Sequence, residues 1–321
     1  MRSQRVFWAC LLSVLSGFGT RADDQLQSRV NKLMRERRGA VLVSNPQTGE
    51  ILAEWNHELA FGRVFPPGST AKVVACAVAL EEGLIAADHR VFCRGVPELL
   101  GKPFRCSHPP ALEPYTVISA LANSCNYFFV ALSDRLRADS LTHGYAQFGF
   151  GDVMEAGNAD VSVGTVSVSD SPAAKARAVL GESPAVVTPA QLLSVYSTVA
   201  TRGAAYRLRR PSASKGPPAI QRRIKLQAAT WKTLVQGLEE CVRSGTGQAA
   251  AVEGVRVAGK TGTATVNRGG ASHAWFVGFA PVDSPEVALV VFLVRGTGAR
   301  DAAPLAGRIL GHYFALKSRR R

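Results

Sequence analysis

Short apolar runs and longer amphipathic stretches alternate along this chain of 321 residues. Near the N-terminus, residues 39–43 and 51–55 are apolar runs on either side of a polar segment, 44–49, that contains proline and glycine. This pattern predicts two strands joined by a turn. Residues 25–38, directly before the first strand, have the composition of a helix.

The middle of the chain has mainly helical periodicity. We expect a helix from about Ser69 to Gly83 and a helix–break–helix over 113–137. A third helix starts at Thr188, where threonine, proline and glutamine form an N-terminal capping pattern, and ends before Gly203. Residues 230–243 are amphipathic and predict a fourth helix.

The last third of the chain again favours strands. The apolar runs 255–264, 274–279 and 286–294 predict three strands, and 304–316 predicts a closing helix. Strands at both ends with helices between them indicate an α+β fold, an α/β sandwich. We expect one antiparallel sheet, built from the N- and C-terminal strands and flanked by helices, with an all-helical lobe inserted in the middle.

The first 22 residues have the features of an export signal. Arg2 and Arg5 precede an apolar run over residues 6–18, and a small residue, Ala22, follows it. An uncleaved membrane anchor is the alternative, although the run is short for a bilayer of about 30 Å. We therefore divide the chain into a signal, 1–22, and a mature region, 23–321. We expect an exported protein of the periplasm or cell envelope, at the outer face of the cytoplasmic membrane, with at most peripheral or signal-anchor membrane association.

Charge and cysteine content narrow the possible partners. The net charge of +14 suits acidic surroundings such as an anionic cell wall. Basic residues are not interleaved with aromatic ones, and zinc-finger spacing is absent, so we expect no nucleic-acid partner, no metal and no cofactor.

Five cysteines remain beyond the signal, an odd number that does not fit a disulfide framework. Cys93 and Cys106 flank one loop and are the expected disulfide pair in an oxidising compartment.

Candidate chemistry starts at the predicted helix that begins at Ser69. Lys72 lies one turn further along the same face, where it could take the proton of the Ser69 hydroxyl if burial lowered its pKa. An ordinary helix start, with a capping serine and a buried lysine, is the alternative. The same Ser-x-x-Lys pattern recurs at Ser212 and Lys215, but prolines and glycines around that copy exclude a helix.

Two further motifs follow in order: Ser124-Cys125-Asn126 at the predicted helix break, and Lys260-Thr261-Gly262 on a predicted strand. This set is typical of penicillin-binding proteins and class A β-lactamases. The region from Gly39 to Phe314 resembles the transpeptidase domain of penicillin-binding proteins, most closely the class B type. The larger cell-wall transpeptidases carry a further N-terminal domain, for which the segment between Ala22 and Gly39 is too short.

The resemblance implies roles for the first two motifs. Ser69 would attack a D-Ala-D-Ala-like peptide, or a β-lactam that mimics it, to form an acyl-enzyme, and Lys72 would take its proton. Ser124 would relay a proton to the leaving amine. Asn126 would orient Lys72 and hold the substrate amide.

The resemblance also implies roles on the strand. Lys260, Thr261 and Thr263 would bind the substrate carboxylate. The backbone N–H groups of Ser69 and Thr263 would form the oxyanion hole. Gly262 would let the strand approach the substrate closely.

The implied function is a peptidoglycan D,D-transpeptidase that acts on stem peptides and is inhibited by β-lactams, with other cell-wall synthesis proteins as possible partners. The alternatives are a D,D-carboxypeptidase, a β-lactamase, or a non-catalytic β-lactam-sensing or wall-binding receptor or scaffold. No Glu-x-x-Leu-Asn stretch follows Asn126, which argues against a class A β-lactamase. Glu182 stands where the family often has glutamine, and we expect it at the surface rather than in catalysis.

Overall fold

The computed structural model describes residues 24–108, 112–154, 162–182, 184–210, 216–265 and 271–319. Five antiparallel strands form the central sheet, in the order β2–β1–β7–β6–β5. Their bounds are β1 (Gly39–Ser44), β2 (Ile51–Trp55), β5 (Ala258–Thr265), β6 (Ser272–Ala280) and β7 (Val287–Leu293). Strands from the two ends of the chain pair directly, with Val41 of β1 opposite Val291 of β7. The predicted α+β architecture, with one antiparallel sheet built from the chain ends, is confirmed.

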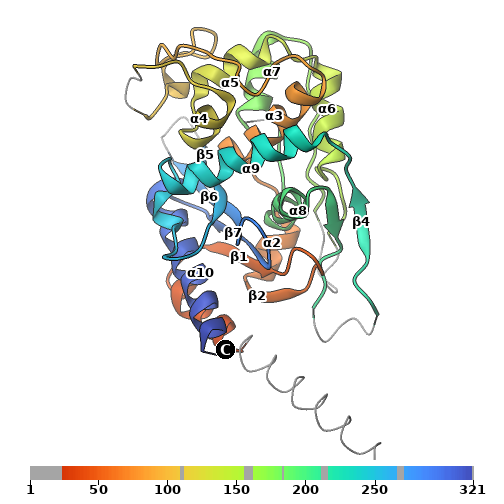
Figure 1. Ribbon diagram of the computed structural model, residues 1–321, viewed down its shortest axis with the longest axis vertical. Coiled ribbons are helices and arrows are strands. Elements are labelled where there is room, and N and C mark those ends of the chain that lie inside the picture. Colours follow the sequence, from red (N-terminus) through yellow and green to blue (C-terminus); the bar gives the residue numbers. More distant parts are fainter. Residues whose placement is uncertain are drawn as a thin grey trace, which may run out of the picture.

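Successive side chains of each strand point to opposite sides of the sheet, and both faces of the sheet are buried. Leu42 and Val290 belong to the core on one face, whereas Val41 and Val291 belong to the core on the other. Helix α8 (Pro189–Ala200) packs on the first face. Helix α10 (Ala303–Ser318) and the helix of residues 24–34 cover the second face, at the bottom of Figure 1.

The inserted helices form a lobe at one end of the sheet, at the top of Figure 1. The lobe contains α3 (Lys72–Glu81), α4 (Val117–Ala122), α5 (Asn126–Ser133), α6 (Ala138–Gln147) and α7 (Pro172–Val179). Helix α9 (Ala228–Arg243) packs against α4 and α3 of the lobe and against β5 of the sheet. It therefore joins the lobe to the edge strand that carries the third motif.

Several elements were not predicted from the sequence. These are α2 (His57–Gly62), α6, α7, and a hairpin of β3 (Ala204–Tyr206) and β4 (Ile220–Arg223). Short turns add the 3₁₀ segments Gly68–Ala71, Lys102–Phe104 and Gln248–Ala250 and a π-helical turn at Gly298–Ala302. The first predicted strand of the last third begins at Ala258 instead of Val255, because Val255 turns back to form a bridge with Val252.

The predicted export signal, residues 1–22, and the second Ser-x-x-Lys copy, Ser212 to Lys215, lie outside the described residues. Within the described part of the chain, no helix has both the length and the apolar character to cross a bilayer.

Candidate active site

The segment on both sides of Ser69 is fixed by hydrogen bonds from distant elements. Trp275 of β6 donates its indole N–H to the Pro66 carbonyl at 3.0 Å, and the Tyr196 hydroxyl of α8 donates to the Thr70 carbonyl at 2.9 Å. Gly68 has a left-handed φ of 56°, and a Cβ there would lie 2.9 Å from the Thr263 carbonyl oxygen. The chain can therefore turn sharply into the Gly68–Ala71 segment only with glycine at this position.

Lys72 begins α3 and is completely buried. Its Nζ donates to Asn126 Oδ1 at 2.7 Å, to the Ser124 carbonyl at 2.9 Å and to Ser124 Oγ at 3.2 Å. Burial, followed by the charge of nearby Lys260, lowers the pKa of Lys72 from 10.5 to about 7. A lysine with this pKa is substantially neutral near pH 7, as a general base must be.

Ser124 and Asn126 lie at the junction of α4 and α5. Ser124 has a left-handed φ of 55°, which is uncommon for a residue other than glycine and occurs often at functional sites. Asn126 uses its Oδ1 for Lys72, while its Nδ2 donates to the carbonyls of Phe104 at 2.9 Å and Arg105 at 3.3 Å. The Asn126 amide therefore links the buried lysine to the loop that precedes α4.

Successive side chains on β5 point to opposite faces of the sheet, so the residues of the third motif lie on two different faces. Lys260 is fully buried, with its Nζ donating to the Thr261 carbonyl at 3.1 Å, whereas Thr261 and Thr263 line the cleft beside Ser69. Burial lowers the pKa of Lys260. Lys260 lies near Lys72 and not on the cleft wall. Its positive charge therefore lowers the pKa of the Lys72 amine.

Gly262 makes a close contact inside the protein. A Cβ at this position would lie 2.8 Å from the Pro67 carbonyl oxygen and 2.9 Å from the Thr70 methyl carbon. The close approach at Gly262 is therefore to the segment that holds Ser69, on the side of β5 opposite to Thr261 and Thr263. A close approach of substrate to the strand at Gly262 stays a prediction.

Residues of all three motifs line a cleft of about 450 Å³ between β5 and the helical lobe. The cleft wall includes Ser69 and also Ser124 and Asn126. Five threonines contribute hydroxyl groups to it: Thr246, Thr261, Thr263, Thr265 and Thr297. Two cations, Arg105 and Arg300, also lie on the wall, so the cleft suits an anionic, hydrogen-bonding ligand.

Comparison with known proteins agrees with this geometry. The family model described as "Penicillin binding protein transpeptidase domain" matches residues 39–311. The chain belongs to this family. Stage V sporulation protein D of Bacillus subtilis is 30% identical over 316 residues, which cover 85% of this chain and 48% of that protein. Peptidoglycan D,D-transpeptidase PbpA of Mycobacterium tuberculosis is 29% identical, covering 85% of this chain and 66% of that protein.

Solved structures extend the similarity to the fold. The transpeptidase domain of penicillin-binding protein 3 from Burkholderia pseudomallei matches with a TM-score of 0.78 and 25% identity, covering 94% of each chain. These relatives place the chain with the class B penicillin-binding proteins. The chain spans about half to two thirds of the length of the curated relatives it matches.

Several cleft residues were missed or misplaced by the sequence analysis of this penicillin-binding protein. Glu182 was expected at the surface, but it lies on the cleft wall. Burial raises the pKa of its carboxyl group, while the Thr265 backbone N–H and the Arg177 charge lower it. Thr297 and Arg300 reach the cleft from the segment after β7 and carried no motif that could have identified them.

The predicted Cys93–Cys106 disulfide is absent from the structure. The two sulfurs lie 3.5 Å apart, far beyond a disulfide bond length of about 2.05 Å, and both thiols are free. The loop that carries them is also the loop that holds the Asn126 amide.

Proposed function

We propose that this protein is a peptidoglycan D,D-transpeptidase that works through a serine acyl-enzyme. The observation that carries the proposal is the position of Lys72: it is buried, shifted to a pKa of about 7, and hydrogen-bonded to Ser124 and Asn126, one turn after Ser69. The same position is what activation of a serine hydroxyl requires, because the hydroxyl is a weak nucleophile without a base.

In the proposed first step, the Ser69 oxygen attacks the carbonyl carbon of the terminal D-Ala-D-Ala bond, and its proton passes to neutral Lys72. The backbone N–H groups of Ser69 and Thr263 stabilise the oxyanion of the tetrahedral intermediate. The intermediate then collapses as the C–N bond breaks. Ser124 relays the proton from Lys72 to the departing amine of D-alanine, leaving an ester on Ser69.

In the second step, the amine of another stem peptide attacks that ester and the cross-link forms, releasing the Ser69 hydroxyl. Before the first step, the C-terminal carboxylate of the donor peptide, which leaves with D-alanine, would be held by the hydroxyls of Thr261 and Thr263 on the cleft wall. Arg300 supplies a nearby positive charge. A β-lactam presents a carboxylate and a reactive amide carbonyl in the same way, and would acylate Ser69.

Covalent labelling tests the proposal directly. A fluorescent penicillin should label the purified protein, and Ser69→Ala should abolish labelling. Ser212→Ala, in the second Ser-x-x-Lys copy, is the matched control and should label like the unaltered protein. Labelling of folded Ser69→Ala protein would contradict the assignment of the nucleophile.

Turnover of peptide substrates distinguishes an enzyme from a β-lactam sensor. Purified protein given stem pentapeptides should release D-alanine and, with an acceptor amine, form cross-linked product. D-alanine release without cross-linked product would favour a D,D-carboxypeptidase. Acylation by penicillin without any peptide turnover would favour a sensor or scaffold.

We also propose that the protein works outside the cytoplasm, next to other cell-wall synthesis proteins. Arginines followed by an apolar run within residues 1–22 support export. Fusion of an alkaline phosphatase, active only after export, to residues 1–40 should give phosphatase activity, whereas a fusion to residues 23–40 should not. N-terminal sequencing of the exported protein distinguishes cleavage near Ala22 from an intact anchor.

A further inference from the structure

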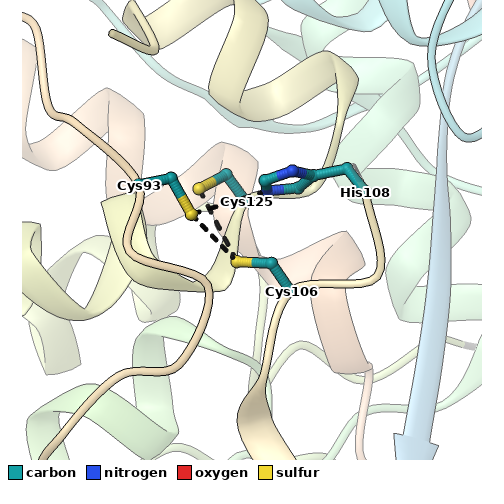
Figure 2. A group of neighbouring side chains, drawn as sticks. All are labelled: Cys93, Cys106, His108 and Cys125. Atoms are coloured by element: carbon teal, nitrogen blue, oxygen red, sulfur yellow. Dashed lines mark hydrogen bonds between the residues drawn. The ribbon is translucent and has the colours of Figure 1, made fainter. Parts of the chain in front are cut away.

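Four side chains with metal-binding atoms converge beside the active site, outside the three motifs' catalytic groups (Figure 2). They are Cys93, Cys106, His108 and Cys125, and their donor atoms all lie within 4.8 Å of one another. Three segments contribute: the start of the loop, its end, and the N-terminus of α5, where Cys125 is the capping residue. Three thiols and an imidazole placed this close together are a potential set of zinc ligands.

Three of the separations between donor atoms lie within about 0.3 Å of those in a tetrahedral zinc site. Zn–S bonds of about 2.3 Å and Zn–N bonds of about 2.0 Å place sulfurs roughly 3.8 Å apart and sulfur and nitrogen roughly 3.5 Å apart. Cys106 Sγ lies 3.5 Å from Cys93 Sγ and 3.8 Å from Cys125 Sγ. His108 Nε2 lies 3.8 Å from Cys93 Sγ.

Backbone groups around the cluster donate to each sulfur. The N–H of Gly95 donates to Cys93 Sγ at 3.3 Å. The N–H groups of Tyr127 and Phe128, in the first turn of α5, donate to Cys106 Sγ and Cys125 Sγ, both at 3.4 Å. Donors of this kind, and the positive end of a helix, stabilise thiolates, which are the form that binds metal.

The histidine is oriented by a second contact. Its Nδ1 lies 2.9 Å from the Tyr115 hydroxyl, which leaves Nε2 facing the sulfurs. In a neutral ring that binds metal through Nε2, Nδ1 carries the proton and donates it to such an oxygen. Hydrogen bonds from the remote nitrogen of a ligating histidine are a general feature of zinc sites.

We propose that Cys93, Cys106, His108 and Cys125 bind one zinc ion in a closed, structural Cys₃His site. Binding releases one proton from each of the three thiols, so the zinc complex carries one net negative charge. Four protein ligands leave no position for water, which distinguishes the site from a catalytic zinc centre. These ligands lack the close Cys-x-x-Cys spacing and meet only when the loop folds onto α5, which is why no metal was expected from the sequence.

The zinc site would position a residue of the active site. Cys125 lies between Ser124 and Asn126 in the second motif, and the loop between Cys93 and His108 contains the carbonyls of Phe104 and Arg105 that accept from Asn126 Nδ2. Zinc would therefore fix both partners of this contact: the loop that carries the two carbonyls and the start of α5 that carries Asn126. Asn126 would then present its Oδ1 to Lys72 in one orientation.

Metal content and cobalt substitution test the site independently of the proposed function. Full-length protein purified without chelator should contain about one zinc per chain, and replacement with Co²⁺ should give the visible and thiolate charge-transfer bands of tetrahedral cobalt. Cys93→Ser should lose the metal. Cys76→Ala, which removes a thiol of the α3 core outside the cluster, should retain it. Cys93→Asp, which restores an oxygen ligand, should recover zinc binding in part.

The positioning role predicts a particular kinetic pattern. Chelator-treated protein should be acylated by penicillin at least about tenfold more slowly at saturation, with a smaller change in the concentration that gives half-maximal rate. Added Zn²⁺ should restore the rate. Unaltered protein that contains no metal, shows no tetrahedral cobalt spectrum and carries a Cys93–Cys106 disulfide by peptide mapping would overturn the proposal. Zinc-containing protein whose acylation rate is unaffected by zinc removal would overturn the positioning role.

Discussion

The Lys72 Nζ lies 2.7 Å from Asn126 Oδ1, and this hydrogen bond joins the first motif to the second inside the protein. Together with the contacts to Ser124, it fixes the buried nitrogen of the proposed base. Asn126 is held in turn by two loop carbonyls, so its amide cannot rotate without losing contacts on both sides.

Asn126→Ala should slow acylation of Ser69 by penicillin. Hydrogen bonds to charged groups contribute about 1.5–3 kcal/mol, which corresponds to roughly a ten- to hundredfold loss in rate. Stopped-flow or gel-based labelling rates measure the effect. Asn123→Ala is the matched control, since Asn123 Nδ2 donates to the Ser119 carbonyl of α4 and not to the base, and it should label at nearly the unaltered rate. Equal rates for both variants would contradict the role of Asn126.

The pH dependence of acylation should report the pKa of Lys72. Because burial and the Lys260 charge lower that pKa to about 7, the fraction of neutral lysine falls as the pH drops below 7. The second-order rate constant for acylation should therefore decline about tenfold per pH unit below this value and level off above it.

Lys260→Met should move this acid limb to higher pH, because removal of the neighbouring cation raises the pKa of Lys72. The midpoint of the profile is informative even if the variant is slower overall. A midpoint that stays in place or moves to lower pH would show that Lys260 does not act on Lys72 through its charge.

Gly262→Ala should disturb the Ser69 segment, because the new Cβ would lie 2.8 Å from the Pro67 carbonyl oxygen. Displacement of a nucleophile by a fraction of an ångström to about 1 Å can cost roughly tenfold to a hundredfold in rate. Labelling rates and the free energy of unfolding should both fall. Gly311→Ala on α10, where a Cβ would meet nothing within 4 Å, should leave labelling unchanged and stabilise the helix by up to about 1 kcal/mol.

Tyr196→Phe should destabilise the protein by about 1–2 kcal/mol, because the buried Thr70 carbonyl loses the hydrogen bond from the tyrosine hydroxyl. Acylation should also slow, since Thr70 follows Ser69 directly. Denaturant unfolding and labelling measure the two effects. Tyr206→Phe in the β3–β4 hairpin, which lies outside the cleft wall, is the control and should change neither by much.

The penicillin acyl-enzyme should persist for minutes or longer if the protein is a transpeptidase. A β-lactamase must also direct a water at the ester with a general base, and Glu182 is the carboxylate among the described cleft residues. Following the adduct by intact-protein mass spectrometry after removal of free drug gives its lifetime. Adduct loss within seconds that Glu182→Gln prevents would favour a β-lactamase, whereas an equally long lifetime in both proteins supports the transpeptidase.

The sequence by itself determined the strands of the central sheet, several of the helices and the identity of the motif residues. The strands at both chain ends and the capped helix from Thr188 follow from local periodicity and capping, which depend on neighbours a few residues away. Ser69, Lys72, Ser124 and the Lys260–Thr263 segment were identifiable because each motif is short and contiguous. The hairpin of β3 and β4 was missed because its strands, Ala204–Tyr206 and Ile220–Arg223, are too brief to show a period.

Tertiary structure decided how these residues act. The pKa of Lys72 depends on burial and on Lys260, which lies 188 residues further along the chain (260 − 72). Strand alternation turns Thr261 and Thr263 to the cleft and Lys260 to the interior, and it directs Gly262 at the Ser69 segment. The placement of Glu182 and the convergence of Cys93 and Cys106 on Cys125 likewise arise only when the loops close onto the helical lobe. Packing of the whole fold sets the distances between residues that are remote in sequence. A local sequence pattern therefore cannot predict these distances.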